Sequence, residues 1–373
     1  MLNQVSRFDA APIPSGDEIV YRLPPFRLEV VFAALAETID WHLSAYGIPE
    51  AWKTTRGRGI RVAVLDTGID AAHPDLQATV LDARDFTGSA SGCADRVGHG
   101  THVAGLVAAR QDDRGVVGIC PGLAEEGGGL LIAKVLADDA GGLDSWIAAG
   151  VDWAIERGAH LVSMSLGSPQ PGTSLYLAIR RATAAGLFVI CAAGNHGRDD
   201  SVDYPARWPE TIAVAAVDRH GRAAPFSSRG PQVDVAAPGQ DILSTYPGGR
   251  YAKLSGTSMA TPFVTGVVAL MLAKHRQLES HTPVKTIDQL REHLARTADD
   301  AGSPGKDPAY GYGLINPRSM LAAPPAGELP IWTGLRWNVE IGGTPAAFVL
   351  VPRDAQVVIH GALGGMAQRT VLI

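Results

Sequence analysis

The chain has 373 residues, of which 46% are hydrophobic and 19% are charged, and these proportions exclude a largely disordered protein. Its formal net charge of −6 argues against a nucleic acid or an anionic membrane as a partner, because both attract basic surfaces. The three cysteines, Cys93, Cys120 and Cys191, cannot all pair within one chain, so the sequence does not predict a disulfide-stabilised scaffold.

The N-terminal segment, residues 1–40, is rich in proline and contains no apolar stretch typical of a secretory signal or a membrane span. We therefore expect a cytoplasmic protein. A short helix is predicted over Leu28–Thr38, and the rest of the segment is expected to be irregular.

From Gly59 onward, short apolar runs alternate with longer helical stretches. The predicted buried strands are Ile60–Leu65, Leu130–Val135, Leu161–Leu166, Leu187–Ala193 and Thr211–Val217. The predicted helices are His99–Ala109, Ser145–Arg157, Ser174–Ala185, Thr257–His275 and Thr286–Thr297. This alternation predicts an α/β fold, with a three-layer, doubly wound, mostly parallel sheet flanked by helices.

The character of the sequence changes after Ala323, where a Pro-rich connector begins. Beyond it, short apolar runs at Ala347–Val351 and Val357–His360 favour a small β-rich appendage. The predicted organisation is therefore an N-terminal extension over 1–40, a main domain over 41–322, and a linker with its appendage over 323–373.

Three segments carry residue types that hydrolytic enzymes use. Asp66 ends an apolar strand in VLDTGID, His99 begins a helix in GHGTHVAG, and Ser258 precedes a long helix in LSGTSMATP. Each has an ordinary structural interpretation when taken alone, as a turn residue, a packed histidine and a helix cap. Together they supply an acid, a base and a nucleophile, because imidazole activates a serine hydroxyl best when a carboxylate orients the ring.

The order Asp–His–Ser, and the strings VLDTGID, GHGTHVAG, SMSLG, CAAGN, FSSRGP, APG and SGTSMATP, resemble the subtilisin-like serine proteases over about Trp41–Asn316. The resemblance is nearest to the intracellular branch of that family. It implies a serine endopeptidase that forms an acyl-enzyme on Ser258. It also implies that Asn195, in AAGN, and the backbone N–H of Ser258 stabilise the oxyanion.

The resemblance further assigns the segments that bind substrate. Ser165, Leu166 and Gly167, together with Gly141 and Gly142, are implied to hold a protein or peptide substrate as an added β-strand. Binding of this kind uses hydrogen bonds to the peptide backbone, so peptides of many sequences can bind.

Asp203 departs from the family pattern, which usually has a small residue at the bottom of the pocket for the residue before the cut. A carboxylate there would favour Lys or Arg before the cut. The alternative is that Asp203 belongs to a solvated acidic loop outside the pocket.

A structural calcium ion is a further implication of the resemblance. Asp75 and Asp112 match positions that bind Ca²⁺ in many relatives, and the backbone carbonyls of Arg110, Arg114 and Val116 would complete an oxygen cage. No cofactor is expected to take part in the chemistry.

The N-terminal segment is shorter than the folded pro-domain of the extracellular relatives. We therefore expect residues 1–40 to be a short inhibitory extension that lies across the cleft until it is removed.

The sequence has two alternative interpretations. An α/β-hydrolase esterase requires Gly-x-Ser-x-Gly, but Ala260 occupies the last position of that motif here, and the acid precedes the serine in the chain. The other is a catalytically silent, subtilisin-like peptide-binding module. Such a module usually lacks a triad member or the oxyanion donor, and this sequence retains them all.

Overall fold

The computed structural model describes residues 18–33, 36–277, 284–323, 337–341 and 344–348. Contacts divide the chain into two units, Met1–Ala326 and Gly327–Ile373. The first unit carries every predicted site residue, and the second contains a short antiparallel hairpin.

The first unit is built on a seven-stranded parallel sheet with the strand order β10-β9-β8-β7-β3-β5-β4. Its strands are β3 (Arg61–Asp66), β4 (Val80–Asp85), β5 (Gly129–Lys134), β7 (Leu161–Met164), β8 (Phe188–Ala192), β9 (Ile212–Val217) and β10 (Val233–Pro238). The central strands are buried along their whole length, as a parallel sheet covered on both faces requires.

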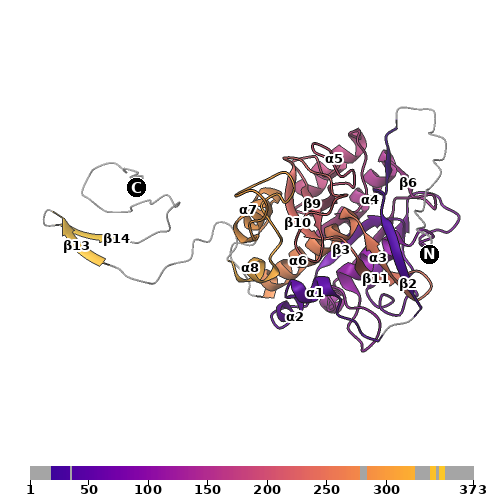
Figure 1. The fold of residues 1–373 in the computed structure, drawn as a ribbon, viewed down its shortest axis with the longest axis horizontal. Coiled ribbons are helices and arrows are strands. Elements are labelled where there is room, and N and C mark those ends of the chain that lie inside the picture. Colours follow the sequence, from indigo (N-terminus) through magenta and orange to yellow (C-terminus); the bar gives the residue numbers. More distant parts are fainter. Residues whose placement is uncertain (1–17, 34–35, 278–283, 324–336, 342–343, 349–373) are drawn as a thin grey trace. The chain divides into compact units, whose positions relative to one another are not determined.

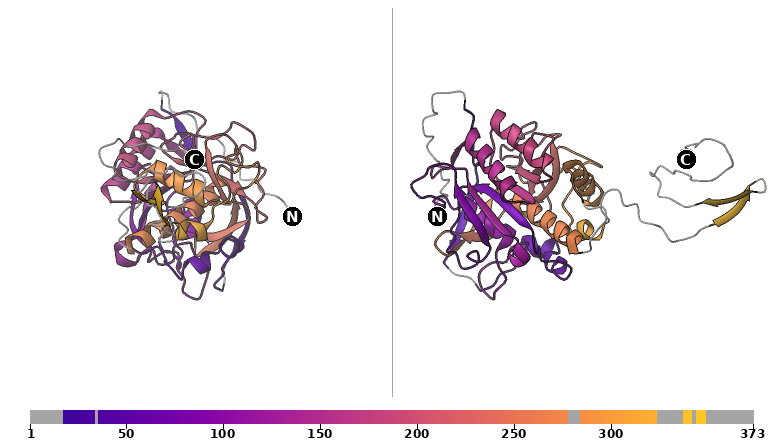
Figure 2. Two further views of the ribbon diagram at one scale, coloured as in Figure 1. Left: turned by 90° about the vertical axis from the view of Figure 1, so that its left-hand side faces the viewer. Right: turned by 180° about the vertical axis from the view of Figure 1, so that it is seen from behind.

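Helices cover both faces of this sheet (Figures 1 and 2). The principal helices are α3 (His99–Ala108), α4 (Asp144–Glu156), α5 (Thr173–Ala184) and α6 (Thr257–Gln277). On β3, Val62 and Val64 pack into one core cluster with α3 and α6, whereas Ala63 and Leu65 pack into the other with α4 and α5. The three-layer α/β architecture predicted from the sequence is confirmed.

Helix α6 is the central helix of its layer. Among the described helices, only its segment Thr257–Arg276 has the length and hydropathy of a membrane span, and 94% of that segment is buried inside the protein. Its apolar character is that of a core helix.

Smaller elements complete the two units. They are α1 (Trp41–Ala45), α2 (Ile48–Ala51), η1 (Glu125–Gly127), α7 (Ile287–Thr297), α8 (Pro317–Ala322), β13 (Trp337–Ile341) and β14 (Thr344–Phe348). Strands β13 and β14 form the antiparallel hairpin of the second unit, in the region predicted to be β-rich. The predicted run Val357–His360, and the end of the run at 349–351, lie outside the described residues.

The helix predicted over Leu28–Thr38 is wrong, because this region begins with a strand. The strands concerned are β1 (Val20–Arg22), β2 (Arg27–Phe32), β6 (Gly141–Leu143), β11 (Ile242–Tyr246) and β12 (Arg250–Ser255). Strand β2 pairs with β12, and β12 pairs in turn with β11, in an antiparallel sheet. Strand β2 forms backbone hydrogen bonds with the free edge of β12. This pairing between distant segments makes Arg27–Phe32 a strand and not a helix.

Candidate active site

Asp66 and His99 meet at the carboxyl end of the parallel sheet. Asp66 is the last residue of β3, and His99 is the first residue of α3. His99 Nδ1 lies 2.8 Å from Asp66 Oδ1, and neither side chain is exposed. The backbone N–H of Thr67 donates to the same carboxylate oxygen at 2.7 Å. The contact orients the imidazole ring, and His99 Nε2 is buried without a hydrogen-bond partner among the described residues.

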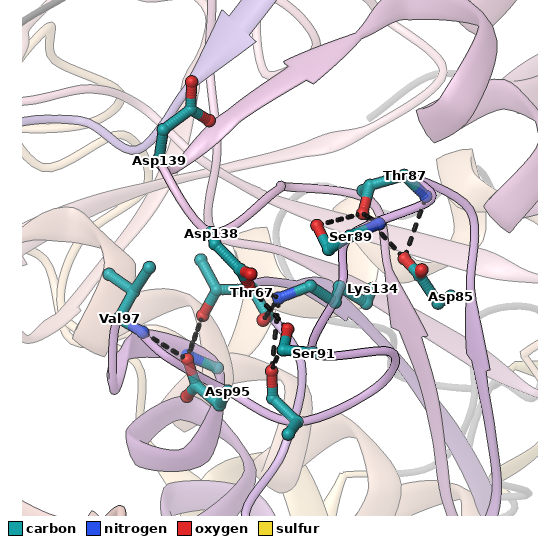
Figure 3. A network of polar contacts seen from close by, with 12 residues as sticks. Thr67, Asp85, Thr87, Ser89, Ser91, Asp95, Val97, Lys134, Asp138 and Asp139 are labelled. Carbon is teal, nitrogen blue, oxygen red and sulfur yellow. Dashed lines mark hydrogen bonds and ion pairs between the residues drawn. The ribbon is translucent and has the colours of Figure 1, made fainter.

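A second buried carboxylate, Asp95, fixes the loop that leads into α3 (Figure 3). Its Oδ1 accepts hydrogen bonds from Thr67 Oγ1 at 2.8 Å and from the Val97 N–H at 3.0 Å. Its Oδ2 accepts both from the Thr101 N–H and from the Thr101 hydroxyl, at 2.8 Å each. Asp95 therefore ties the residue after Asp66 to the first turn of the helix that carries His99.

Ser258 and Asn195 lie together at the N-terminus of α6. Asn195 Oδ1 accepts from the Thr257 N–H at 2.9 Å and from Thr257 Oγ1 at 2.8 Å, so the amide presents its Nδ2 donor away from Thr257. The buried Ser258 hydroxyl donates to the Ser165 carbonyl at 3.4 Å, and Ser165 Oγ donates to the Ser258 carbonyl at 2.9 Å. The Ser258 hydroxyl is thus turned toward Ser165 and forms no hydrogen bond with His99 in this structure.

The chain's own N-terminal extension occupies the segments predicted to bind substrate. Strand β1 pairs antiparallel with β6, which places Tyr21 opposite Gly142 and Arg22 opposite Gly141. On its other side, the Arg22 N–H donates to the Gly167 carbonyl at 3.0 Å, and the Gly167 N–H donates back to the Arg22 carbonyl at 2.9 Å. Residues 20–22 therefore form the middle strand between β6 and Gly167.

The side chains of this extension are buried as well. Tyr21 has no exposed surface, and its hydroxyl accepts a hydrogen bond from the Gly172 N–H at 3.0 Å. Burial of the phenol raises the pKa of Tyr21 above its ordinary value. Leu23 is 9% exposed. The extension is anchored by side chains in addition to its backbone pairing.

Next, the extension passes Asn195, the predicted oxyanion donor. Asn195 Nδ2 donates to the carbonyl oxygen of Pro25 at 2.9 Å. The ring of Phe26 packs 5.1 Å from the imidazole of His99, measured between ring centroids. The peptide group between Pro25 and Phe26 thus lies beside the donor and the base that the sequence analysis singled out.

Asp203 is buried rather than solvated, with 6% of its surface exposed. A Cβ atom added to Gly167 would lie 2.9 Å from Asp203 Cβ, and one added to Gly194 would lie 2.6 Å from Asp203 Oδ2. Both carboxylate oxygens contact His196 Nε2, at 3.0 and 2.9 Å. Burial raises the pKa of Asp203, and His196 opposes that rise. The structure brings Asp203 against Gly167, in one of the predicted substrate-binding segments, and against Gly194, which precedes Asn195, but gives it an internal partner.

Residues predicted to bind calcium lie around one loop. Asp75 Oδ2 accepts from the Val116 N–H at 3.0 Å, and Asp75 Oδ1 accepts from the Tyr251 hydroxyl at 3.1 Å. The Arg110 N–H donates to the Asp75 carbonyl at 3.0 Å. Asp75 is therefore fixed directly against the loop that carries the other predicted ligands.

The other carboxylate of that loop is incompletely satisfied. Asp112 Oδ2 lies 3.4 Å from the guanidinium of Arg114, whereas Asp112 Oδ1 is buried without a hydrogen-bond partner among the described residues. The described residues contain no group of three or more His, Cys, Asp or Glu side chains arranged so that they could hold a metal ion. A cage made mainly of backbone carbonyls would not form such a cluster, and an unsatisfied buried carboxylate oxygen suits a calcium ion.

Three further residues contact the predicted site and were not predicted from the sequence. Asp95 precedes His99 by four positions in DRVGHG, and Lys134 ends the apolar run LLIAK. Those signals were present, because a charged residue within or beside a buried segment needs a partner. His196, the partner of Asp203, directly follows Asn195.

Comparison with known proteins identifies the family. Residues 57–313 match the model of the subtilase family. An intracellular serine protease of Paenibacillus polymyxa is 47% identical over 231 residues, which cover 60% of this chain and 69% of that protein. A thermostable alkaline protease of Halalkalibacterium halodurans is 42% identical over 283 residues, 76% of this chain and 73% of that protein. Subtilisin BL of Lederbergia lenta is 42% identical over 282 residues, 75% of this chain and 98% of that protein. This chain therefore belongs to the subtilase family of serine endopeptidases.

Proposed function

We propose that Asp66, His99 and Ser258 form the catalytic triad of this endopeptidase. The observation that carries the proposal is the buried 2.8 Å contact between His99 Nδ1 and Asp66 Oδ1. An Asp that accepts a hydrogen bond from the Nδ1–H group leaves Nε2 as the basic nitrogen. Ser258 begins a helix at which the dipole and free amides favour negative charge, and Asn195 Nδ2 points to the same place.

In the proposed reaction, Ser258 Oγ attacks the carbonyl carbon of the scissile peptide bond while His99 Nε2 accepts the hydroxyl proton. Asp66 stabilises the resulting imidazolium, and the carbonyl oxygen becomes an oxyanion bound by Asn195 Nδ2 and the Ser258 N–H. The imidazolium then gives its proton to the departing amine, which leaves an acyl-enzyme on Ser258. A water molecule, deprotonated by His99, hydrolyses this ester and restores the serine.

The substrate is a protein or peptide bound as an extended strand. Support comes from the docked extension, whose backbone pairs with β6 on one side and with Gly167 on the other. Any extended peptide can form these bonds, since they involve main-chain atoms alone. A cytoplasmic location is proposed as well, and the intracellular serine protease of Paenibacillus polymyxa supports it.

Asp203 is proposed to favour Lys or Arg before the cut, because a buried carboxylate beside Gly167 attracts a cationic side chain. We expect a mixture of unrelated peptides to be cut internally, and faster after Lys or Arg than after Leu or Phe. Mass spectrometry of the products measures both results. The Asp203→Asn variant is the control and should lose the preference. Faster cleavage after apolar residues in the unmodified protein would contradict the proposed preference, whereas the absence of any cleavage would contradict the proposed activity.

The extension is proposed to inhibit the enzyme until it is released. Support comes from the position of the Pro25 carbonyl at Asn195 and of the Phe26 ring against His99, where a substrate would have to lie. Pro24 and Pro25 fix their own φ angles and lack N–H donors, so this part of the strand is stiff and differs from an ordinary substrate.

Tyr21→Ala in the full chain should raise the initial rate of peptide hydrolysis about tenfold or more. Tyr21 is fully buried, and removal of a large buried aromatic ring costs about 3–5 kcal/mol, which weakens docking of the extension. The measurement is the rate before any self-cleavage, verified by the mass of the chain. Val31→Ala, on β2 at a side chain 40% exposed, is the matched control and should leave the rate unchanged. Equal rates for Tyr21→Ala and the unmodified chain would count against inhibition by the extension.

Calcium is proposed to bind between Asp75 and the loop 110–116, through the Asp75 and Asp112 carboxylates and the carbonyls of Arg110, Arg114 and Val116. The unsatisfied Asp112 Oδ1 supports this assignment. The ion would stabilise the loop and take no part in hydrolysis.

Removal of calcium with EGTA should lower Tm by about 5–10 °C, because a ligand present at about 100 times its Kd stabilises a protein by about 2.7 kcal/mol. Differential scanning calorimetry of the Ser258→Ala variant measures this without self-digestion. Asp112→Asn should show a smaller difference between calcium and EGTA. A Tm that does not respond to EGTA would exclude the site.

A further inference from the structure

Lys134 is a fully buried lysine at the end of β5, directly behind the proposed triad. Its strand register places it opposite Asp66. Lys134 Nζ donates to the Thr67 carbonyl at 2.6 Å, to Asp138 Oδ1 at 3.0 Å and to the Ala94 carbonyl at 3.3 Å (Figure 3). The ammonium group thus has three acceptors, and the shortest contact is to the residue that follows Asp66.

Buried negative charge gathers at the same place. Asp66 is not exposed and Asp95 is 6% exposed, and both contact Thr67. Asp66 Oδ2 is buried without a hydrogen-bond partner among the described residues. Two buried carboxylates are costly unless positive charge lies nearby, and the Lys134 ammonium group contacts the same residue, Thr67, through its carbonyl oxygen.

Asp138 connects this lysine to solvent. Its side chain is 38% exposed, whereas that of Lys134 is not exposed. Ser91 Oγ also donates to Asp138 Oδ1, at 2.7 Å. Burial raises the pKa of Asp138, but the hydrogen bonds from Ser91 and Lys134 and the positive charge of Lys134 together outweigh burial, so the pKa of Asp138 is lowered. Asp138 is therefore an ionised counter-charge at the surface end of the network.

We propose that Lys134 is a positioning residue for the triad, which holds the Thr67 peptide behind Asp66 and supplies positive charge to the Asp66–His99 pair, and that Asp138 moderates this charge. The inference rests on the proposed triad. Its consequence concerns the pH dependence of hydrolysis, because catalysis requires the imidazole in its basic form.

The sign of each effect follows from electrostatics. Positive charge near His99 disfavours the imidazolium, so Lys134 extends activity toward lower pH. Loss of Lys134 should move the acid limb of the kcat/KM profile to higher pH. Loss of the negative charge on Asp138 should leave Lys134 less compensated and move the same limb to lower pH. A purely structural role would not move the two profiles in opposite directions.

The other charged groups near the pair are the same in every variant. Asp95 lies beside Thr67, Asp85 of β4 lies opposite Lys134 in the strand register, and Arg96 acts on Asp138. His102 follows His99 by one helical turn, and burial lowers its pKa to about 3, so it stays neutral throughout the working range. None of these groups changes with the substitutions, so the difference between the profiles belongs to Lys134 and Asp138.

The test compares kcat/KM between pH 5 and 10 for the full chain, Lys134→Met, Asp138→Asn and Asp152→Asn. Asp152 is the matched control, because it is a surface carboxylate with 40% of its side chain exposed and pairs with Arg181 on the helix layer. The change in net charge is the same for both Asp→Asn variants. Normalising each profile to its plateau removes differences in the fraction of molecules that are active.

We expect the acid limb of Lys134→Met to move up by about 0.5 pH unit, that of Asp138→Asn to move down, and that of Asp152→Asn to stay in place. If Lys134→Met fails to fold, the pH profile of Asp138→Asn tests the inference by itself. This variant is expected to fold because the side chain of Asp138 is partly exposed. Profiles that coincide with the unmodified chain, or that shift in one common direction, would overturn the inference. Full hydrolysis by Ser258→Ala would instead overturn the proposed triad.

Discussion

Replacing Ser258 with alanine is expected to lower kcat for peptide hydrolysis about 10⁶-fold, the order of loss that follows removal of the serine nucleophile in a subtilisin. The reason is that Ser258 Oγ is the only atom of the triad that forms a covalent bond to the substrate in the proposed reaction. Ser258 is fully buried at the start of α6, where alanine fits without displacing its neighbours. The fold should therefore survive the change.

The measurement uses a fluorogenic peptide with the full chain and the variant side by side. Unchanged circular dichroism and Tm exclude unfolding as the cause of the loss. A variant that keeps more than a tenth of the activity would mean that another group attacks the substrate.

Replacing Asp66 with asparagine should lower kcat about 10⁴-fold. Asp66 Oδ1 accepts a hydrogen bond from the Thr67 N–H and faces His99 Nδ1 at 2.8 Å. An amide in that position can place its NH₂ group toward the ring, which then carries its proton on Nε2. In that tautomer His99 cannot take the proton of Ser258.

This loss can be distinguished from a general distortion of the site. KM should change little, because Asp66 contacts no substrate group in the proposed complex. Asp95→Asn, in contrast, removes acceptors from the loop before α3 and should lower Tm as well. A loss of less than a hundredfold for Asp66→Asn, with Tm unchanged, would contradict the role of Asp66.

Much of the central sheet could be predicted from the sequence, since β3, β5, β7, β8 and β9 are short apolar runs buried on both faces. Two strands were missed. The outermost strand, β4, reads VLDARD and is only partly buried, so its pattern is weak. The strand at the other edge, β10, contains the buried Asp234, whose charge is compensated by Arg291 of α7 at 3.0 Å. Sequence alone does not reveal that partner.

The conformation of the N-terminal extension could not be predicted, for a different reason. The run RLEVVF has no strong preference of its own, and its conformation depends on the free edge of β12. An inhibitory role for residues 1–40 could be expected from the resemblance, but the strand pairing that supports it could not. Nor could the seating of Pro25 at Asn195, because that contact joins residues 170 positions apart.

For the proposed site, short motifs were sufficient to single out Asp66, His99, Ser258 and Asn195 as candidates. Their supporting residues were missed, because Asp95, Lys134 and His196 act through contacts between separate segments. The expectation for Asp203 is an intermediate case. The acidic loop sequence does not indicate that Asp203 is buried. Because Asp203 contacts His196, a basic substrate side chain would approach a carboxylate that already has a partner.

The most direct test of the account is reaction with a fluorophosphonate probe, followed by peptide mass spectrometry of the labelled protein. Such probes phosphonylate a serine that a neighbouring base has activated. We predict a single adduct, on Ser258, that forms faster in Tyr21→Ala than in the unmodified chain and is abolished in His99→Ala. Labelling of another serine, or no labelling of Ser258 after the extension has been released, would contradict the proposed mechanism.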